Sequence, residues 1–516
     1  KFLNCGRMHS CSSSISPEKT CLLLIESTES TMHDTSLSTD RASANNDSIV
    51  NGPRNEDEVK MSIDEAMDAI GTGRFQNHIL WAAGSCFMAD SMEIMILSFL
   101  SPILQSEWNL TITQTATVTS VVFAGAMMGT LVLGPMSDKF GRMPIFILSG
   151  TIICIFGFGT AFTNEYVAFL LTRFMVGFGV GGLTVPFDTL AEFLPTETRG
   201  KYLIYIEYFW TLGSLGVTTF AFFTIEFGRS WRLFVLLCSI PCLVSVILGL
   251  IYVPESPRWL LSKGKHDKAL HILRTAATTN GKDADLIFPH RNIKLHAEKD
   301  ESTFRDLLRP RWRKLTLLLW FLWGAFAFTY YGTIMTVMRI FKKNNDYAFN
   351  YSAIFFSGFA EIVGTVVLVL LIDRIGRVRI LVGSLVCGGI FVLLLCMTSM
   401  DNYPWVAIMF AFLARLSEMM LSCILWLCTA ELLTTEIRTT GHSAANAVAR
   451  IGGFISPYIV SDNSSLLLVG IFMLCVHLLG AYVASNLPET KGTHLGEVPF
   501  HDEHENENLH KKEIEV

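Results

Sequence analysis

The chain has 516 residues, of which 51% are hydrophobic and 17% are charged, and its formal net charge is −6. This share of charged residues is too small for the surface of an ordinary soluble multidomain protein. The composition therefore indicates a membrane protein, and no basic aromatic segment favours nucleic acid as a partner.

The two ends of the chain are polar. Residues 1–74 are rich in Ser, Thr, Asn and acidic residues and lack apolar periodicity, which predicts a disordered cytoplasmic N-terminal tail. Within it, the segment from Met61 to Met67 could form a short helix before the membrane. Residues 491–516 predict a cytoplasmic C-terminal tail, and its histidines lack a repeated ligand spacing, so we expect no metal site and no cofactor.

Between the tails, the chain contains twelve apolar runs of the length that a bilayer span needs, about 20 residues. The predicted fold is an all-α membrane protein with twelve transmembrane helices in two six-helix halves, 75–253 and 314–490. The predicted spans are 79–104, 115–136, 144–162, 165–187, 200–223, 231–253, 314–338, 351–372, 378–399, 404–428, 440–460 and 464–486.

Basic residues mark one side of the membrane. They concentrate in the connections that follow even-numbered spans, so the positive-inside rule places both termini and the linker 254–313 in the cytoplasm. Within the linker, the segment from His266 to Arg274 spaces its apolar residues as an amphipathic helix that could lie along the membrane face.

A charged pattern occurs twice. Gly134 to Arg142 contains an Asp, a Gly and an Arg that recur from Asp373 to Arg377, and the two aspartates, Asp138 and Asp373, stand 235 residues apart (373 − 138). Parallel halves of this kind occur in secondary transporters, with the substrate site between the halves at mid-membrane. We expect Asp138 and Arg142 to latch the cytoplasmic ends of spans two and three to the other half in the outward-facing state. The predicted gating residues are Asp138, Gly141, Arg142, Glu192, Arg199, Asp373, Gly376, Arg377, Glu431 and Arg438.

Several ionisable residues fall inside predicted spans, where each needs a partner, a water-filled cavity or a function. Asp90 and Glu93 lie three residues apart and share a helix face. Counted from the span boundaries, Arg450 lies about 18 Å deep and Glu207 about 12 Å deep. The functional interpretation is that Arg450 binds an anionic or zwitterionic substrate while Asp90, Glu93 or Glu207 carries a proton. The alternative is a structural ion network; Glu361 could also face the cavity.

Arg173 and Arg415 occupy equivalent places in spans four and ten, which favours a shared structural role. Each could pair with Glu192, Glu431 or a hinge Asp to hold the cytoplasmic gate shut, and Glu418 could simply neutralise Arg415. Aromatic residues could line the cavity and stack on a substrate ring. The candidates are Trp320, Trp323, Tyr330 and Tyr331.

Taken together, the motifs resemble the major facilitator superfamily over residues 75–490. Pro254 to Arg258 and Pro488 to Gly492 are similar to its sugar-porter-related branch. The runs around Asp90, Glu192, Glu207 and Arg450 resemble synaptic vesicle 2-related proteins and their niacin and organic-ion transporter relatives. Met143 and Val369 depart from the hinge pattern of the superfamily.

The resemblance and the buried charges predict a monomeric transporter, not an enzyme, in the plasma membrane or an intracellular vesicle membrane. Its halves would rock around a central cavity to move a small organic ion, coupled to protons or by facilitated diffusion. The alternatives are a non-transporting receptor or scaffold of the same fold, and a neutral-sugar porter.

Overall fold

The computed structural model describes residues 60–182, 184–288, 294–296, 304–343, 349–398, 404–433, 437–461 and 464–491. The chain divides into two units, Lys1–Glu56 and Asp57–Val516, and every described residue belongs to the second. The predictions for residues 1–59 and 492–516 lie outside the described residues.

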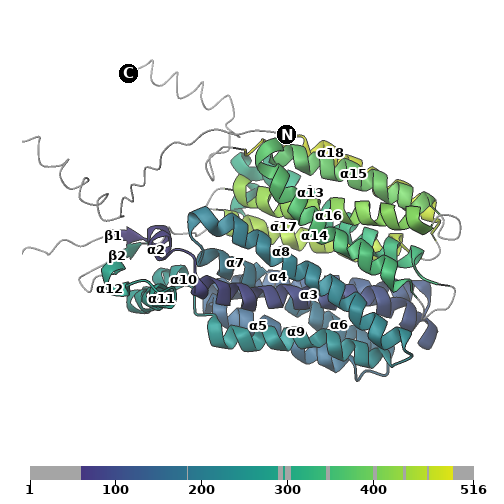
Figure 1. Ribbon diagram of the computed structural model, residues 1–516, viewed down its shortest axis with the longest axis horizontal. Coiled ribbons are helices and arrows are strands. Elements are labelled where there is room, and N and C mark those ends of the chain that lie inside the picture. The colour runs from purple at the N-terminus through teal and green to yellow at the C-terminus, as the bar shows by residue number, and fades with distance from the viewer. Residues whose placement is uncertain are drawn as a thin grey trace, which may run out of the picture. The chain divides into compact units, whose positions relative to one another are not determined.

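The first half of the described chain is a bundle of long helices, drawn in purple to teal in Figure 1. α4 starts with a capping box, in which Thr111 and Gln114 each bind the backbone N–H of the other, and the residue that follows its last turn is Gly141, with φ of 114°. The elements of this half are α3 (Arg74–Glu107), α4 (Ile112–Phe140), α5 (Arg142–Thr160), α6 (Tyr166–Val180), α7 (Thr184–Glu192), α8 (Thr196–Ala221), the π-helical turn η1 (Phe222–Glu226) and α9 (Trp231–Tyr252).

The second half repeats this arrangement, drawn in green to yellow in Figure 1. Its helices are α13 (Pro310–Ile340), α14 (Tyr351–Ile375), α15 (Arg377–Met397), α16 (Pro404–Leu432), α17 (Arg438–Ile459) and α18 (Leu466–Ala484). The halves meet where α17 packs against α4 and α14 packs against α8.

The fold prediction is confirmed. Because α6 and α7 share one predicted span, the described helices account for twelve spans in two halves of six. Eleven of these spans are long and apolar enough to cross a membrane. The twelfth, α17, is less apolar because it carries His442, Asn446 and Arg450. The first span starts at Arg74 rather than at 79, and α13 starts at Pro310 rather than at 314.

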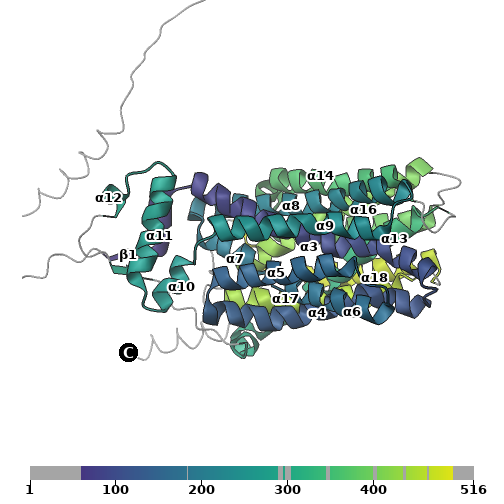
Figure 2. The same ribbon diagram turned by 90° about the horizontal axis from the view of Figure 1, so that it is seen from below.

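Short elements from both sides of the first half form a small folded region at one end of the long helices, as Figures 1 and 2 show. Strand β1 pairs in parallel with β2. The elements are β1 (Lys60–Ser62), α2 (Ile63–Ile70), α10 (Pro257–Ser262), α11 (His266–Thr279), α12 (Ala284–Ile287) and β2 (Lys294–His296). The 3₁₀ turn η2 (Asp306–Leu308) packs against α13 instead.

This region corrects two predictions. The N-terminal tail was expected to continue to residue 74, whereas the chain is folded from residue 60; three-residue strands are too short to give a periodic signal. α11 was expected to lie along the membrane face. Its apolar face, which includes Ala269 and Leu273, is instead buried against α10 and α2.

Asp64 of α2 binds two guanidinium groups. It lies 3.0 Å from Nη2 of Arg199 on α8 and 2.5 Å from Nη2 of Arg258 on α10. Partial burial raises the pKa of Asp64, but Arg258 and Arg199 outweigh this effect, so the pKa of the carboxyl lies below its usual range. Arg199, predicted as a gating residue, therefore holds α2 in place in this structure.

We expect Asp64→Asn to loosen α2 at neutral pH. The Asp64 carboxylate is 47% exposed, so solvent screening limits its contribution to about 0.5–1 kcal/mol. Because the folded-state pKa is lowered, this contribution is present above the unfolded pKa of about 3.9 and is lost as the pH falls below it. Hydrogen exchange of the α2 amides should become about two- to fivefold faster at pH 7.

The matched control is Asp267→Asn, which removes an exposed carboxylate from α11. It should leave α2 exchange unchanged. Equal exchange in Asp64→Asn and the unmodified protein would contradict this role for Asp64.

Candidate functional site

Glu93 of α3 forms a buried ion pair with Arg173 of α6. Nη1 of Arg173 donates to Oε2 of Glu93 at 2.8 Å, and the Ser239 hydroxyl donates to Oε1 at 3.1 Å. Arg173 also donates to Thr160 Oγ1 at 2.9 and 3.2 Å. Both charged side chains are at most 1% exposed, so the two charges neutralise each other inside the first half. The prediction that Arg173 pairs with a gate carboxylate is therefore wrong.

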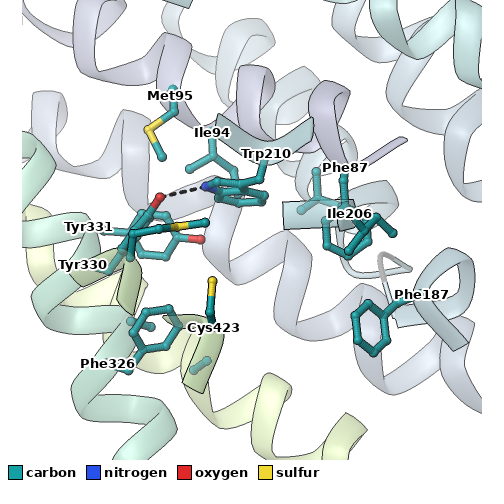
Figure 3. Close-up of a cluster of buried hydrophobic side chains, with 14 of the residues drawn as sticks. Phe87, Ile94, Met95, Phe187, Ile206, Trp210, Phe326, Tyr330, Tyr331 and Cys423 are labelled. Carbon is teal, nitrogen blue, oxygen red and sulfur yellow. Dashed lines mark hydrogen bonds between the residues drawn. The ribbon is translucent and has the colours of Figure 1, made fainter. Parts of the chain in front are cut away.

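Arg415 of α16 takes part in a chain of polar contacts that joins the two halves. Its Nη2 lies 2.6 Å from Oε1 of Glu361 and donates to the hydroxyl of Ser214 in the first half at 3.1 Å. The same Glu361 oxygen accepts from the Tyr330 hydroxyl at 3.0 Å, and that hydroxyl accepts from the indole N–H of Trp210 at 2.7 Å. Figure 3 shows the bond from Trp210, with Tyr331 and Phe326 nearby. The carboxylate of Glu361 is therefore paired with the guanidinium of Arg415.

Glu418 of α16 does not neutralise Arg415, as the sequence had suggested. Oε1 of Glu418 lies 3.0 Å from Nε2 of His477 and accepts from the Thr333 hydroxyl at 3.0 Å. The Thr329 hydroxyl lies 3.2 Å from Oε2. Arg415 pairs with a carboxylate on α14 instead of one at the gate, so both earlier interpretations of this residue are wrong.

A cavity lies between the halves. It encloses about 50 Å³, which is room for only a few water molecules. Of the predicted residues, Glu207 and Arg450 both line it, and so do three of the four predicted aromatic residues. The lining residues are Phe87, Glu207, Trp210, Trp323, Phe326, Ala327, Tyr330, Tyr331, Ser422, Trp426, Asn446, Ala449 and Arg450. Trp320 lies elsewhere and stacks on Phe304, with ring centroids 5.6 Å apart.

Arg450 is the cation of this cavity. Among the described residues, it has no acidic partner within 4 Å, although its charge acts on Asp90 and on the Tyr331 hydroxyl. Asp90 is fully buried, and neither of its carboxylate oxygens has a hydrogen-bond partner in the described part of the chain. Asp90 and Glu93 therefore have different electrostatic partners, although they share a helix.

Several cavity residues were not predicted. Phe326 precedes Tyr330 by four residues, and Asn446 precedes Arg450 by four, so each lies one helical turn from a predicted residue on the same face. This spacing was a usable signal. Trp426 had no such signal, because its place in the cavity depends on how α16 packs.

The two charged hinges form ion pairs within their own halves. Nη1 of Arg142 lies 2.9 Å from Asp138, and Nε lies 3.3 Å from Glu192 at the end of α7. In the second half, Nε of Arg377 lies 3.4 Å from Glu431. No contact from Asp138 or Arg142 to the opposite half is found among the described residues, and the latch, which was expected in the outward-facing state, stays a prediction.

The other predicted gating residues have different surroundings. Arg199 binds Asp64, as described above. The side chains of Asp373 and Arg438 lie outside the described residues.

Two glutamates cap the helices that follow the hinges. Glu255 accepts a 2.7 Å hydrogen bond from the N–H that follows Gly141, and Glu489 accepts one of the same length from the N–H that follows Gly376. Both glycines have positive φ, 114° and 105°. A Cβ on either glycine would lie within 2.8 Å of the facing carboxylate, so the turn requires glycine. The carboxylates also complement the helix N-termini.

Residues 95–500 match the family model described as sugar (and other) transporter. The chain is 32% identical over 460 residues to the synaptic vesicle 2-related protein of Xenopus laevis, covering 84% of this chain and 82% of that protein. It is 30% identical over 450 residues to the organic cation/carnitine transporter 7 of Arabidopsis thaliana, covering 78% of this chain and 88% of that protein.

A solved structure shares the fold. The xylose transporter XylE from E. coli, in a partially occluded inward-open conformation, superposes with a TM-score of 0.65 at 20% identity, covering 82% of this chain and all of that one. With the two bundles of six helices, these matches show that the chain is a multi-pass membrane transporter that belongs to the sugar (and other) transporter family of the major facilitator superfamily.

Proposed function

We propose that this transporter moves a small organic ion, with an anion or a zwitterion favoured, by secondary active or facilitative alternating access around the central cavity. The observation that carries the proposal is Arg450, a cavity-lining guanidinium without an acidic partner within ion-pair distance among the described residues.

A guanidinium does not deprotonate at working pH, and its planar donors suit a carboxylate. Holding Arg450 inside the bundle therefore costs free energy that a bound anion would offset. A neutral sugar would supply hydrogen bonds to Arg450 but no opposite charge. The charged wall thus favours an organic ion over a sugar.

Glu207 extends this argument to zwitterions. It lines the same cavity from α8 of the first half, whereas Arg450 lines it from α17 of the second half. A zwitterion could place its carboxylate on Arg450 and its cationic group on Glu207, and so bind both halves at once. The relative named organic cation/carnitine transporter 7 supports an ionic substrate and leaves the sign of its charge open.

Uptake into proteoliposomes tests the proposal. The probes are radiolabelled nicotinate, glycine betaine, tetraethylammonium and D-glucose, which represent an anion, a zwitterion, a cation and a neutral sugar. We expect uptake of nicotinate or glycine betaine. Uptake of none of the four, together with saturable binding of one, would favour the scaffold alternative; uptake of D-glucose alone would favour a sugar porter.

Variants of Arg450 test whether its guanidinium binds the substrate. Loss of a charged hydrogen bond costs about 1.5–3 kcal/mol, so Arg450→Ala should lower the transport efficiency for the anionic or zwitterionic probe about 10- to 100-fold. Arg450→Lys should be intermediate, because it keeps the charge and loses the planar fork. Arg311→Ala, which removes an exposed arginine of α13, is the matched control. The proposal is falsified if Arg450→Ala folds and transports with unchanged affinity.

Asp90 is the proposed proton carrier, because it is fully buried without a hydrogen-bond partner among the described residues and the charge of Arg450 acts on it. Asp90→Asn cannot titrate, so the dependence of uptake on external pH should change while the protein remains folded. Uptake should be measured from pH 5 to 9, with Asp267→Asn as the control. An unchanged pH profile would exclude this role. Glu93→Gln is a poor probe, since it would leave Arg173 buried without its partner, at a cost of about 3–5 kcal/mol.

The two carboxylates that contact Arg142 should differ in their effect on transport. Asp138 is 63% exposed and Glu192 is 16% exposed, so the contact between Glu192 and Arg142 is less screened by water. We expect Glu192→Gln to lower the exchange rate more than Asp138→Asn does, with little loss of folded protein. Exchange of the transported probe in proteoliposomes measures both. A larger effect of Asp138→Asn would support the predicted latch instead.

A further inference from the structure

The Glu93 site has a counterpart in the second half with different chemistry. Ser239 and His477 are 238 residues apart, and Glu93 and Thr333 are 240 apart, close to the repeat spacing of the hinges. The junction of α13, α16 and α18 is therefore the repeat of the junction of α3, α6 and α9. In the second half the carboxylate, Glu418, lies on α16 and the base lies on α18.

The hydrogen bonds of His477 define where its protons must be. Nδ1 lies 2.8 Å from the carbonyl oxygen of Met473, which can only accept, so Nδ1 carries a proton. Nε2 lies 3.0 Å from Oε1 of Glu418. If this second contact held no proton, a lone pair of Nε2 would face a carboxylate lone pair inside the bundle. The contact therefore contains one proton, shared between the imidazole and the carboxyl group.

The surroundings are built to hold this arrangement. His477 is fully buried and Glu418 is 1% exposed. The Thr333 hydroxyl donates to Oε1 of Glu418 from α13. On α15, Gly388 and Gly389 make room for the ring, since a Cβ on Gly388 would lie 3.1 Å from Nε2 and one on Gly389 would lie 2.8 Å from Cβ of His477.

Other ionisable groups on the neighbouring helices have separate partners or positions. Arg415 and Glu361 pair with each other, and Tyr330 binds Glu361. Others are Arg450, Glu207 and Tyr331 in the cavity wall, His442 against Trp426, Cys423 near Thr365, Arg339, which donates to the carbonyl oxygen of Ser464, the buried Cys396 and Cys428, and Cys387 and Cys475 on exposed positions.

We propose that Glu418 and His477 form a proton-binding site of the second half that holds one exchangeable proton, and that this proton must be bound for transport to proceed. Loss of the proton leaves two acceptors 3.0 Å apart, and their repulsion favours a larger distance between the Glu418 and His477 side chains, which lie on α16 and α18. α13 would be disturbed as well, because it donates to Glu418 through Thr333 and lines the cavity through Phe326, Tyr330 and Tyr331.

Proton binding can be tested without a substrate. Solid-state NMR of reconstituted protein, labelled with ¹⁵N in the histidine rings, gives a signal for His477 that is absent from His477→Gln. The spectra are recorded over a pH titration, in which we expect Nδ1 to remain protonated and the proton at the Nε2 contact to leave in one step. A His477 signal that stays constant over this titration would overturn the proposal, whatever the protein transports.

The transport arm rests on the proposed function and uses the probe that the unmodified protein takes up. In Glu418→Gln, an amide N–H can donate to Nε2 in place of the shared proton, so this variant mimics the proton-bound state. Exchange by the unmodified protein should fall at least fivefold at alkaline pH, and Glu418→Gln should remove this fall. Glu197→Gln, which changes an exposed glutamate of α8, should retain it.

The outcomes separate the two hypotheses. The same alkaline fall in Glu418→Gln and the unmodified protein would overturn the requirement for the proton. Uptake of none of the probes by the unmodified protein would count against the proposed function, and the NMR titration would then decide proton binding alone. If Glu418→Gln fails to fold, His477→Gln offers the second variant: it leaves the buried carboxylate without its proton-sharing partner and should lower exchange across the whole pH range.

Discussion

A charge inside a membrane-spanning bundle needs a partner within the protein, because lipid offers none. Arg173 meets this constraint with Glu93 and Thr160, and Arg415 meets it with Glu361 and Ser214. These buried contacts lie on the inward faces of α3, α6, α14 and α16. They also leave Arg450 as the buried cation whose surroundings, among the described residues, contain no acidic group within 4 Å. The substrate argument depends on this difference.

The two halves conserve their backbone pattern more closely than their chemistry. Both hinges place a positive-φ glycine over a glutamate that caps the next helix, Glu255 in one half and Glu489 in the other. The helix junctions beyond them differ: one contains a carboxylate with a guanidinium, the other a carboxylate with an imidazole. A guanidinium remains charged at any working pH, whereas an imidazole can exchange its proton near neutrality. The Glu93–Arg173 junction is therefore a fixed ion pair. The Glu418–His477 junction, built on the repeated backbone, is the one whose charge can change with pH.

Much of the fold followed from the sequence, because span length and the spacing of apolar residues are local properties. The predicted spans and the halves matched the structure, and the hinge repeat located the turns at Gly141 and Gly376. Which charged side chains pair with each other was harder to predict from the sequence. Asp90 and Glu93 were expected to act as neighbours on one helix face, yet one is influenced by Arg450 on α17 and the other binds Arg173 on α6. A separation of three residues leaves two side chains about 60° apart around the helix axis, enough to face different neighbouring helices.

Contacts between segments that are distant in the sequence could not be predicted for the same reason. Asp64 binds arginines more than 130 residues away, and Glu418 finds its partner on α18. Sequence spacing favoured the nearer arginine, Arg415, three residues from Glu418. The structure favours His477, since α16 turns the two side chains toward different helices. Local proximity in a helix is thus a weak guide when each residue has several neighbouring helices to choose from.

Some of the hydrogen bonds that join the two halves must break when the halves separate. Trp210 donates to Tyr330, and Arg415 donates to Ser214, across the same interface. Hydrogen bonds contribute about 0.5–1.5 kcal/mol each, and those to charged groups about 1.5–3 kcal/mol. Breaking both contacts would cost a few kcal/mol, which lies within the differential affinity that a ligand can supply between two states. A cavity with room for only a few waters must open before an organic ion fits, so binding and separation of the halves are coupled steps. Tyr330 lines the cavity and also donates to Glu361, which places it where a bound ion could compete directly for the contacts that hold the halves together.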